Sequence, residues 1–341
     1  MPTATRDVEI SALDPATLSD ADAAALAGIT NAADAVDAPH LDPVDASYVR
    51  HKHAHGHDLR PTHGLLVART ADEQAVGYIE LYSQHWDNPQ MLGLGVETHP
   101  DHRGRGVGDA LLKRAVGIAR AEGRTQLLGD AWADSHRARF WERHQYPVAA
   151  RASNRRLVLT DLNHVELAEL LARAEGASPG YELVDLPNPA PDELVDDLLT
   201  LHLAMNDEPL DDLQLHDAQW PADRFRAFEQ AMTVRGCRLH RLLARCTSDG
   251  ELGGHTVVVV EEDRPWVGFQ EDTAVVAGHR GHKLGLRLKI EMLALLAERE
   301  PQLRHIDTWN ADSNRHMIAV NDAIGCVVLG RAVEVQRTLD H

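Results

Sequence analysis

Cysteine is scarce in this sequence. Only Cys237, Cys246 and Cys326 occur, an odd and scattered set, which argues against a disulfide framework and fits a reducing cytoplasm. Long apolar runs are also missing, since none approaches the roughly 18 residues that a membrane-spanning helix needs. The first residues, MPTATRDVEISALD, lack the basic and then apolar pattern of a signal peptide. We therefore expect a cytoplasmic protein that does not act in a membrane.

Basic side chains are outnumbered, with 34 Lys and Arg against 53 Asp and Glu and a formal net charge of −19. Such a field repels phosphate backbones and anionic membranes, so we expect no nucleic-acid partner. It favours a cationic or amine-bearing partner, although acidity that serves solubility alone is an equally good explanation. In this background, any local basic cluster is informative.

The length of 341 residues suits two domains rather than one core. We expect an N-terminal domain over residues 1–160, a helical linker over 161–179 that ends in EGASPG, and a C-terminal domain over 180–341. The pattern of strands and helices predicts an α/β fold for each domain, with a mixed sheet and helices on both faces. A monomer or a homodimer fits the composition equally well.

An internal repeat supports the two domains. His102-Arg103-Gly104 matches His279-Arg280-Gly281, Gly108 matches Gly285, and Asp130-Ala131-Trp132 matches Asp307-Thr308-Trp309, all at an offset of 177 positions. The register is held across a loop, a helix and the next strand, so duplication is the better explanation. In the first copy we expect strands at 7–13, 64–68, 75–81, 91–98 and 127–132, a strand pair within 148–159, and a helix from Ser19 to about Val36.

The segment Arg103-Gly104-Arg105-Gly106-Val107-Gly108 runs from a predicted strand into an amphipathic helix. Its glycines allow positive φ angles and close approach of a ligand to the backbone. The N-terminus of the following helix offers free N–H groups and a partial positive charge, which suits a pyrophosphate. A tight turn without a ligand is the competing explanation.

A histidine-rich segment also occurs, His51-Lys52-His53-Ala54-His55-Gly56-His57. This spacing can converge on a metal ion from a strand or loop. No nearby cysteine or carboxylate completes a ligand set, so we favour a solvated loop and predict no metal site.

With these residues the sequence resembles the GNAT superfamily of acyl-CoA-dependent N-acetyltransferases, whose signature is (Arg/Gln)-x-x-Gly-x-(Gly/Ala). Arg103 to Gly108 satisfies it. The resemblance covers residues 5–160 and again 180–338, where HRGHKLG and TWNADSNRHMIAVNDAIGC resemble a tandem actinobacterial branch. Lys283 there replaces the middle glycine. The resemblance implies two tandem GNAT-like domains, acetyl-CoA as co-substrate and no metal.

By this resemblance pantetheine inserts beside the strand that precedes each loop, and the loop holds the pyrophosphate. The implied donor-binding residues are Val96, Thr98, Arg103, Gly104, Arg105, Gly106, Val107 and Gly108 in the first copy. In the second copy they are Thr273, Val275, Arg280, Gly281, His282, Lys283, Leu284, Gly285, Asn310 and Asn314. Helix capping and local turns explain the two asparagines equally well.

Acetyl transfer to an alkylamine needs a base, because the amine is mostly protonated at pH 7. Glu271 and Asp272 lie beside the implied acyl site, and strand alternation lets only one of them face the cleft. We favour Glu271 as base and Asp272 as amine anchor, or the reverse. Glu97 is the candidate of the first copy. The family's usual tyrosine acid corresponds in position to Trp141 and Asn321, neither of which is an acid at neutral pH.

These residues predict an acetyl-CoA-dependent N-acetyltransferase that acts on the primary amine of a small molecule, with the second copy as the catalytic one. The alternatives are a mycothiol-synthase-like acetyltransferase and a non-catalytic acyl-CoA sensor or scaffold.

Overall fold

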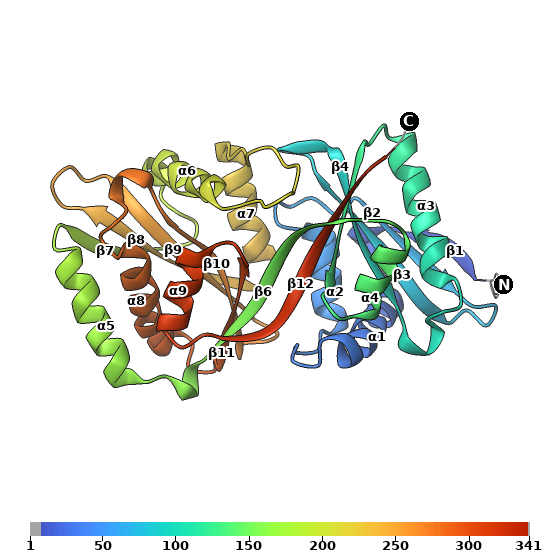
Figure 1. Cartoon of the computed structure of the whole chain (residues 1–341), viewed down its shortest axis with the longest axis horizontal. Helices are drawn as coiled ribbons and strands as arrows, with labels where there is room; N and C mark the ends of the chain where they lie inside the picture. The colour runs from blue at the N-terminus through green and yellow to red at the C-terminus, as the bar shows by residue number, and fades with distance from the viewer. Residues whose placement is uncertain (1–7, 340–341) are drawn as a thin grey trace. The chain divides into compact units, whose positions relative to one another are not determined.

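The computed structural model describes residues 8–339. The chain forms two compact units (Figure 1). The first unit contains the described residues up to Ala152 together with Leu210–His216 and the chain from Gly330 onward, and the second contains Ser153–Pro209 and Asp217–Leu329.

The first unit is built on the strands β1 (Glu9–Leu13), β2 (Gly64–Arg69), β3 (Ala75–Gln84), β4 (Asn88–Thr98), β5 (Gln126–Trp132) and the later part of β12 (Val327–Thr338). They lie in this order in the sheet. Neighbouring strands are antiparallel except β4 and β5, which are parallel. Its helices are α1 (Asp20–Asp37), α2 (Ala46–His55), α3 (Val107–Ala121) and α4 (His136–Arg143).

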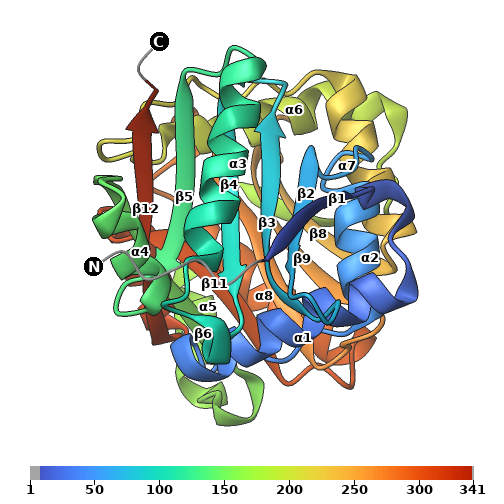
Figure 2. The same cartoon turned by 90° about the vertical axis from the view of Figure 1, so that its right-hand side faces the viewer.

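Alternation along β2 explains the layers of the first unit. Leu65 and Val67 are buried with α1 and α2, whereas Leu66 and Ala68 are buried in the cluster that includes α3, because successive strand side chains point to opposite faces. Helix α3 therefore lies on the face opposite α1 and α2 (Figure 2). The predicted first helix is confirmed, with the Ser19 side chain capping it by accepting from the Asp22 N–H.

The second unit repeats this arrangement. Its strands are β7 (Tyr181–Leu186), β8 (Cys237–Cys246), β9 (Leu252–Glu261), β10 (Val267–Val275) and β11 (His305–Ala311), and its helices are α5 (His164–Ala177), α6 (Val195–Leu203), α7 (Ala222–Val234), α8 (Leu284–Arg299) and α9 (Arg315–Ala323). Strands β7 to β10 pair in sequence as antiparallel neighbours, and β10 pairs with β11 in parallel. The predicted mixed α/β fold is confirmed.

The units differ from the predicted residue ranges at their terminal strands. Residues 332–338 of β12 pair with 132–126 of β5, and Val333 and Val335 are buried in the core of the first unit. Conversely, β6 (Val148–Val158) passes into the second unit, where Arg156 makes a bidentate ion pair with Asp307 at 2.7 and 2.8 Å. Each unit thus contains a strand that the linear division at residues 160 and 180 assigns to the other.

Two local predictions are wrong. The region 148–159 forms the single strand β6 rather than a strand pair, because no turn interrupts its alternation. Residues 51–55 of the histidine-rich segment form the second half of α2 rather than a solvated loop. Its His53 is buried, and the Nδ1 atom lies 2.9 Å from the Thr62 hydroxyl.

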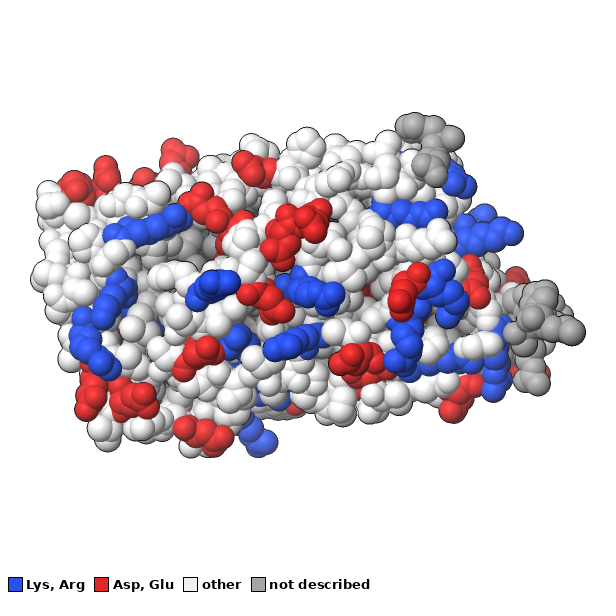
Figure 3. Space-filling view, in the orientation of Figure 1, with Lys and Arg blue, Asp and Glu red and all other residues white. Residues whose placement is uncertain are grey.

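Two global properties complete the description. No helix within residues 8–339 is long and apolar enough to cross a bilayer. On the face drawn in Figure 3, acidic and basic side chains are interspersed rather than separated into single-sign regions.

Candidate active site

In each unit two parallel strands separate partway along their length. Strand β4 pairs with β5 only over Met91–Leu94, and β10 pairs with β11 only over Val267–Phe269. Beyond these points, each strand runs on without a partner on that side toward its glycine-rich loop. Free strand edges offer backbone N–H and C=O groups to an extended ligand.

The two loops share one backbone conformation. Gly104 and Gly106 have φ angles of 70° and 80°, and Gly281 and Lys283 have 87° and 55°. Helices α3 and α8 begin at the next residue, Val107 and Leu284. The lysine at the place of Gly106 therefore leaves the turn intact, and both helix N-termini remain available to an anion.

Lys283 adopts this left-handed conformation against its own steric preference. Such a conformation costs a residue with a Cβ roughly 1–2 kcal/mol, partly offset by the flexibility of glycine in the unfolded chain. We expect Lys283→Gly to raise the free energy of unfolding by up to about 1 kcal/mol in urea denaturation. Gly106→Lys, the matched change in the first unit, should lower it, and a destabilised Lys283→Gly protein would contradict this account.

The signature arginine has the same partners in both units. Arg103 donates through Nε to the Thr98 carbonyl at 3.2 Å and through Nη2 to Asp37 at 2.7 Å. Arg280 donates to the Val275 carbonyl at 3.1 Å and to Asp207 at 2.5 Å. Each arginine thus fixes the end of its strand to a carboxylate, Asp37 at the end of α1 or Asp207 in the turn after α6, and this contact shapes the loop.

A cavity lies at each loop. The first has a volume of about 390 Å³ and is lined by predicted donor-site residues Val96, Thr98, Arg103, Gly104, Gly106, Val107 and Gly108, together with Glu97. The second, of about 700 Å³, is lined by Thr273, Val275, Arg280, Gly281, Lys283, Leu284, Gly285 and Asn314. The structure therefore gathers most of the predicted residues at two equivalent places.

Six predicted residues lie outside these linings: Arg105, Glu271, Asp272, His282, Asn310 and Asn321. His282 contacts the Ala177 carbonyl at the end of α5, with 3.3 Å from its Nδ1 to the oxygen. Asn321 is fully buried and donates to the Asn310 side chain at 2.7 Å. The asparagine pair joins α9 to β11 inside the second unit, while Asn314 caps α9 by accepting from the Met317 N–H.

In the first unit the candidate carboxylate is held by an arginine. Glu97 Oε1 accepts from Arg137 Nη1 of α4 at 2.5 Å, and both residues line the cavity. Burial raises the pKa of Glu97 to about 7, although the guanidinium acts in the opposite direction. Strand β4 is regularly paired here, with Tyr78 opposite Glu97 and Ile79 opposite Val96. Trp141 is fully buried in the core rather than in the cavity.

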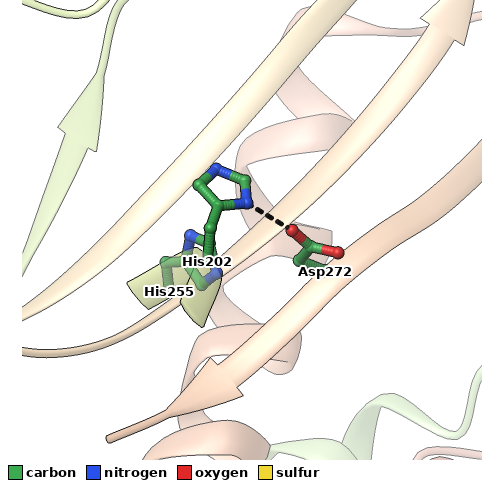
Figure 4. Close-up of side chains that lie close together, drawn as sticks. All are labelled: His202, His255 and Asp272. Atoms are coloured by element: carbon green, nitrogen blue, oxygen red, sulfur yellow. Dashed lines mark ion pairs between the residues drawn. The ribbon is translucent and has the colours of Figure 1, made fainter. Parts of the chain in front are cut away.

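In the second unit the corresponding strand carries a β-bulge. Gln270 pairs with Val258 and Thr273 with Thr256, so Glu271 and Asp272 together face a single residue of β9. Bulges re-aim side chains and are frequent beside active sites. Here Glu271 lies at the surface of the strand, and burial of its carboxyl, together with the charge of Asp272, raises its pKa to about 7. Asp272 points inward, with its Oδ2 2.7 Å from Nδ1 of His202 (Figure 4).

Aromatic and charged groups surround this acid. His202 of α6 stacks on Trp220 at 4.4 Å between ring centroids, and His255 of β9 lies 5.1 Å from it. Burial lowers the pKa of His255 to about 3. Burial favours the protonated form of Asp272, but the two histidines and Arg241 outweigh it and lower the pKa of this carboxyl. Asp272 is therefore an ionised carboxylate between imidazoles.

A buried chain of polar side chains ends at Thr273, which lines the second cavity. The Lys289 ammonium donates to Gln270 Oε1 at 3.1 Å, Gln270 Nε2 donates to the Thr256 hydroxyl at 3.1 Å, and this hydroxyl is 2.8 Å from that of Thr273. At the offset of 177 the first unit has Leu112, Gly93, Ile79 and Val96, none of which has a polar side chain. A polar core is costly where an apolar one would fold, so the chain favours a functional role for the second cavity.

Burial gives Lys289 a characteristic pH dependence, because it lowers the pKa of the ammonium from 10.5 to about 8. Between these values the unfolded chain binds more protons than the folded one, so the lysine's contribution to stability rises with pH. We expect wild-type protein to gain about 2 kcal/mol relative to Lys289→Leu between pH 7 and pH 10. Parallel pH profiles of the two proteins in chemical denaturation would contradict this assignment.

His202, His255, Trp220 and Lys289 were not predicted from the sequence. They lie on α6, on β9, before α7 and on α8, far apart in the chain and without a motif. The repeat offers a partial signal, because the two copies differ in residue type at these positions. The offset of 177 aligns Lys289 with Leu112 and His255 with Tyr78.

Splayed parallel strands, a glycine-rich loop and an open helix N-terminus define an acyl-CoA-binding enzyme of the acetyltransferase type. Residues 32–146 match the model of the acetyltransferase (GNAT) family. No curated protein matches the sequence.

Solved structures agree over the whole chain. A tandem GNAT protein from the clavulanic acid biosynthesis pathway has a TM-score of 0.77 and 25% sequence identity, covering 97% of this chain and 98% of its own. A GCN5-related N-acetyltransferase from Sphaerobacter thermophilus has a TM-score of 0.71 over 97% and 95% of the two chains, with 17% identity, which shows the fold alone. The chain is a tandem GNAT acetyltransferase, and the predictions of family and enzyme class are confirmed.

Proposed function

We propose that the second unit transfers an acetyl group from acetyl-CoA to the primary amine of a small molecule, by direct attack on the thioester. The observation that carries this proposal is the bulge of β10, which turns Asp272 toward His202 one residue before Thr273, where the strand reaches the larger cavity. The first unit lacks the bulge, and its Glu97 is engaged by Arg137.

The residues of the second unit divide the task among them. The loop from Arg280 and the N-terminus of α8 hold the pyrophosphate of the donor, and pantetheine runs along the free edge of β10. The acceptor approaches the bulge, where the Asp272–His202 pair accepts the ammonium proton, so that the free amine attacks the acetyl carbon. Because Asn321 is bonded to Asn310 inside the unit, the departing thiolate takes its proton from water.

An acceptor of positive charge fits the rim of this cavity. Asp207 and Glu208 both line it. Asp207 is paired with Arg280, so Glu208 is the carboxylate that would attract an ammonium group. We propose the reducing cytoplasm as the location, since Cys237, Cys246 and Cys326 are free thiols in the structure.

The test is acetyl-CoA turnover with a panel of small primary amines, measured as release of the CoA thiol and as mass of the acetylated product. We expect release with at least one cationic amine and little with anionic ones. Binding of acetyl-CoA without release across the panel would contradict acetyl transfer and support an acyl-CoA sensor instead.

A further inference from the structure

Within residues 8–339, the second cavity has a wall that the first cavity lacks. The two linings correspond along the strand, the loop and the start of the next helix at the offset of 177 positions, and along α4 and α9 at an offset of 180. Beyond these shared positions, the second lining adds Asn314, Ala319 and residues in and after the short helix η5 (Ala204–Asp207): Ala204, Met205, Asp207, Glu208 and Pro209. Because the shared part contains the glycine-rich loop and suits the donor, the added wall suits the acceptor.

Glu208 is the carboxylate that remains available on this wall. Its neighbour Asp207 is paired with Arg280. Glu208 has a neutral partner instead, since the side-chain amide of Asn314 donates through Nδ2 to Glu208 Oε1 at 3.3 Å. The orientation of this amide is fixed, because Asn314 Oδ1 accepts from the Met317 N–H at the start of α9. Asn314 therefore holds the Glu208 carboxylate at the cavity without neutralising its charge.

The buried pair of Asp272 and His202 lies close to this wall but does not line the cavity. An ammonium group in the cavity therefore needs an intermediate group to pass a proton to the pair. Helix α6, which carries His202, leads directly into η5, and η5 packs against β10. Burial of the Glu208 carboxyl, together with the charge of Asp272, raises the pKa of Glu208. Glu208 is thus a titratable group that both lines the cavity and interacts with Asp272.

We propose that Glu208 is a catalytic residue, which takes the proton of the acceptor ammonium in the cavity and passes it to the Asp272–His202 pair. This inference rests on the proposed acetyl transfer and adds the group that connects the bound acceptor with the pair. A positioned side chain transfers a proton directly or through one water. The ionised carboxylate also attracts the ammonium group, so one residue serves both binding and deprotonation.

The reaction balances with this proton relay. One proton leaves the ammonium nitrogen for a carboxylate oxygen of Glu208, which becomes a neutral acid, and the freed lone pair forms the bond to the acetyl carbon. The carbon–sulfur bond breaks, and CoA leaves as a thiolate. The nitrogen loses its second proton to solvent as the amide forms, and the thiolate takes one proton from solvent. Transfer of the first proton to the Asp272–His202 pair returns Glu208 to its ionised form.

In the first unit an alanine stands at the place of Glu208. Arg103 binds Asp37 as Arg280 binds Asp207, so the residues that follow the two carboxylates correspond, and these are Ala38 and Glu208. Ala38 is fully buried, and its methyl group accepts no proton. The difference agrees with catalysis in the second unit.

The experiment compares full-length Glu208→Gln with wild type on two acceptors at saturating concentration. One is a cationic amine that wild type acetylates, and the other is the alkoxyamine of the same carbon skeleton, a primary amine that is mostly neutral at pH 7. With the cationic amine, kcat should fall about 10²-fold or more. With the alkoxyamine, kcat should stay near the wild-type value, because no proton has to leave before attack. Glu193→Gln, at an exposed residue of η4 (Asp192–Leu194), should keep kcat with both.

The outcomes separate the relay from the enzyme. Wild-type kcat of Glu208→Gln with the cationic amine would overturn the relay and leave acetyl transfer intact. An equal loss with both acceptors would also overturn it, because a structural defect affects the two amines alike. A wild-type protein that acetylates no amine contradicts acetyl transfer itself, and the relay with it. Glu208→Asp keeps a carboxylate and should retain measurable transfer to the cationic amine, whereas a loss as large as that of Glu208→Gln argues against proton transfer by the carboxylate.

Discussion

Asp272→Asn should lower kcat for acetyl transfer by about 10²–10⁴-fold, the range for loss of a positioned acid–base group. Asparagine keeps the shape of the side chain but removes its charge, so the side chain no longer accepts a proton. Since asparagine has the same shape as aspartate, we expect the backbone of the bulge to be retained. Steady-state kinetics with a saturating amine give the effect on kcat separately from that on KM.

Two matched variants make this result interpretable. Glu97→Gln changes the candidate carboxylate of the first unit, and Glu271→Gln changes the exposed neighbour of Asp272. Both should retain kcat within error of wild type. A large loss in Glu97→Gln with full activity in Asp272→Asn would assign the chemistry to the first unit.

Glu229→Ala should be the most destabilising single change that we predict, at about 3–5 kcal/mol. The Glu229 carboxylate is buried and accepts from the Ala190 N–H at 3.0 Å, from Arg226 at 2.6 Å and from Arg241 at 3.1 Å. Arg241 is fully buried, so removal of the carboxylate leaves an uncompensated guanidinium in the core. Urea or thermal denaturation measures the loss.

Asp192→Ala is the control for this effect. Asp192 also pairs with Arg226, but its side chain is 99% exposed, so we expect a change within about 0.5 kcal/mol. Equal effects of the two substitutions would show that Arg241 finds another partner or loses its charge.

The local elements were predictable because their signals are local. Ser19 before an alanine-rich periodic segment predicted the start of α1, and the structure confirms the cap. The register of the repeat predicted two equivalent loops, and these have matching φ angles and matching arginine contacts. The pairing of the terminal strands was not predictable. Alternation in residues 330–338 indicates a strand, but it does not show which strand of which unit lies beside it.

The candidate site was predictable only where it depends on the loop. Alternation required Glu271 and Asp272 to face opposite ways, and the structure places Glu271 at the surface of the strand and Asp272 toward His202. The bulge behind this choice is a property of pairing with β9, and His202, His255 and Lys289 join the site through tertiary packing. For Asn321 the local signal was misleading. Its place in a family-like motif predicted a site residue, whereas the structure buries it against Asn310.

The most direct test of the central claim, that the second unit is catalytic, compares acetyl transfer by two loop variants. Gly285 lines the second cavity, and a Cβ there meets only methyl groups at 4.0 Å, so Gly285→Leu directs a side chain into that cavity. Gly108→Leu is the matched change in the first unit, where the ring edge of Phe140, 3.0 Å from the new Cβ, must move. With both proteins shown to be folded, this account predicts that Gly285→Leu abolishes CoA release and Gly108→Leu retains it. The reverse pattern would contradict it.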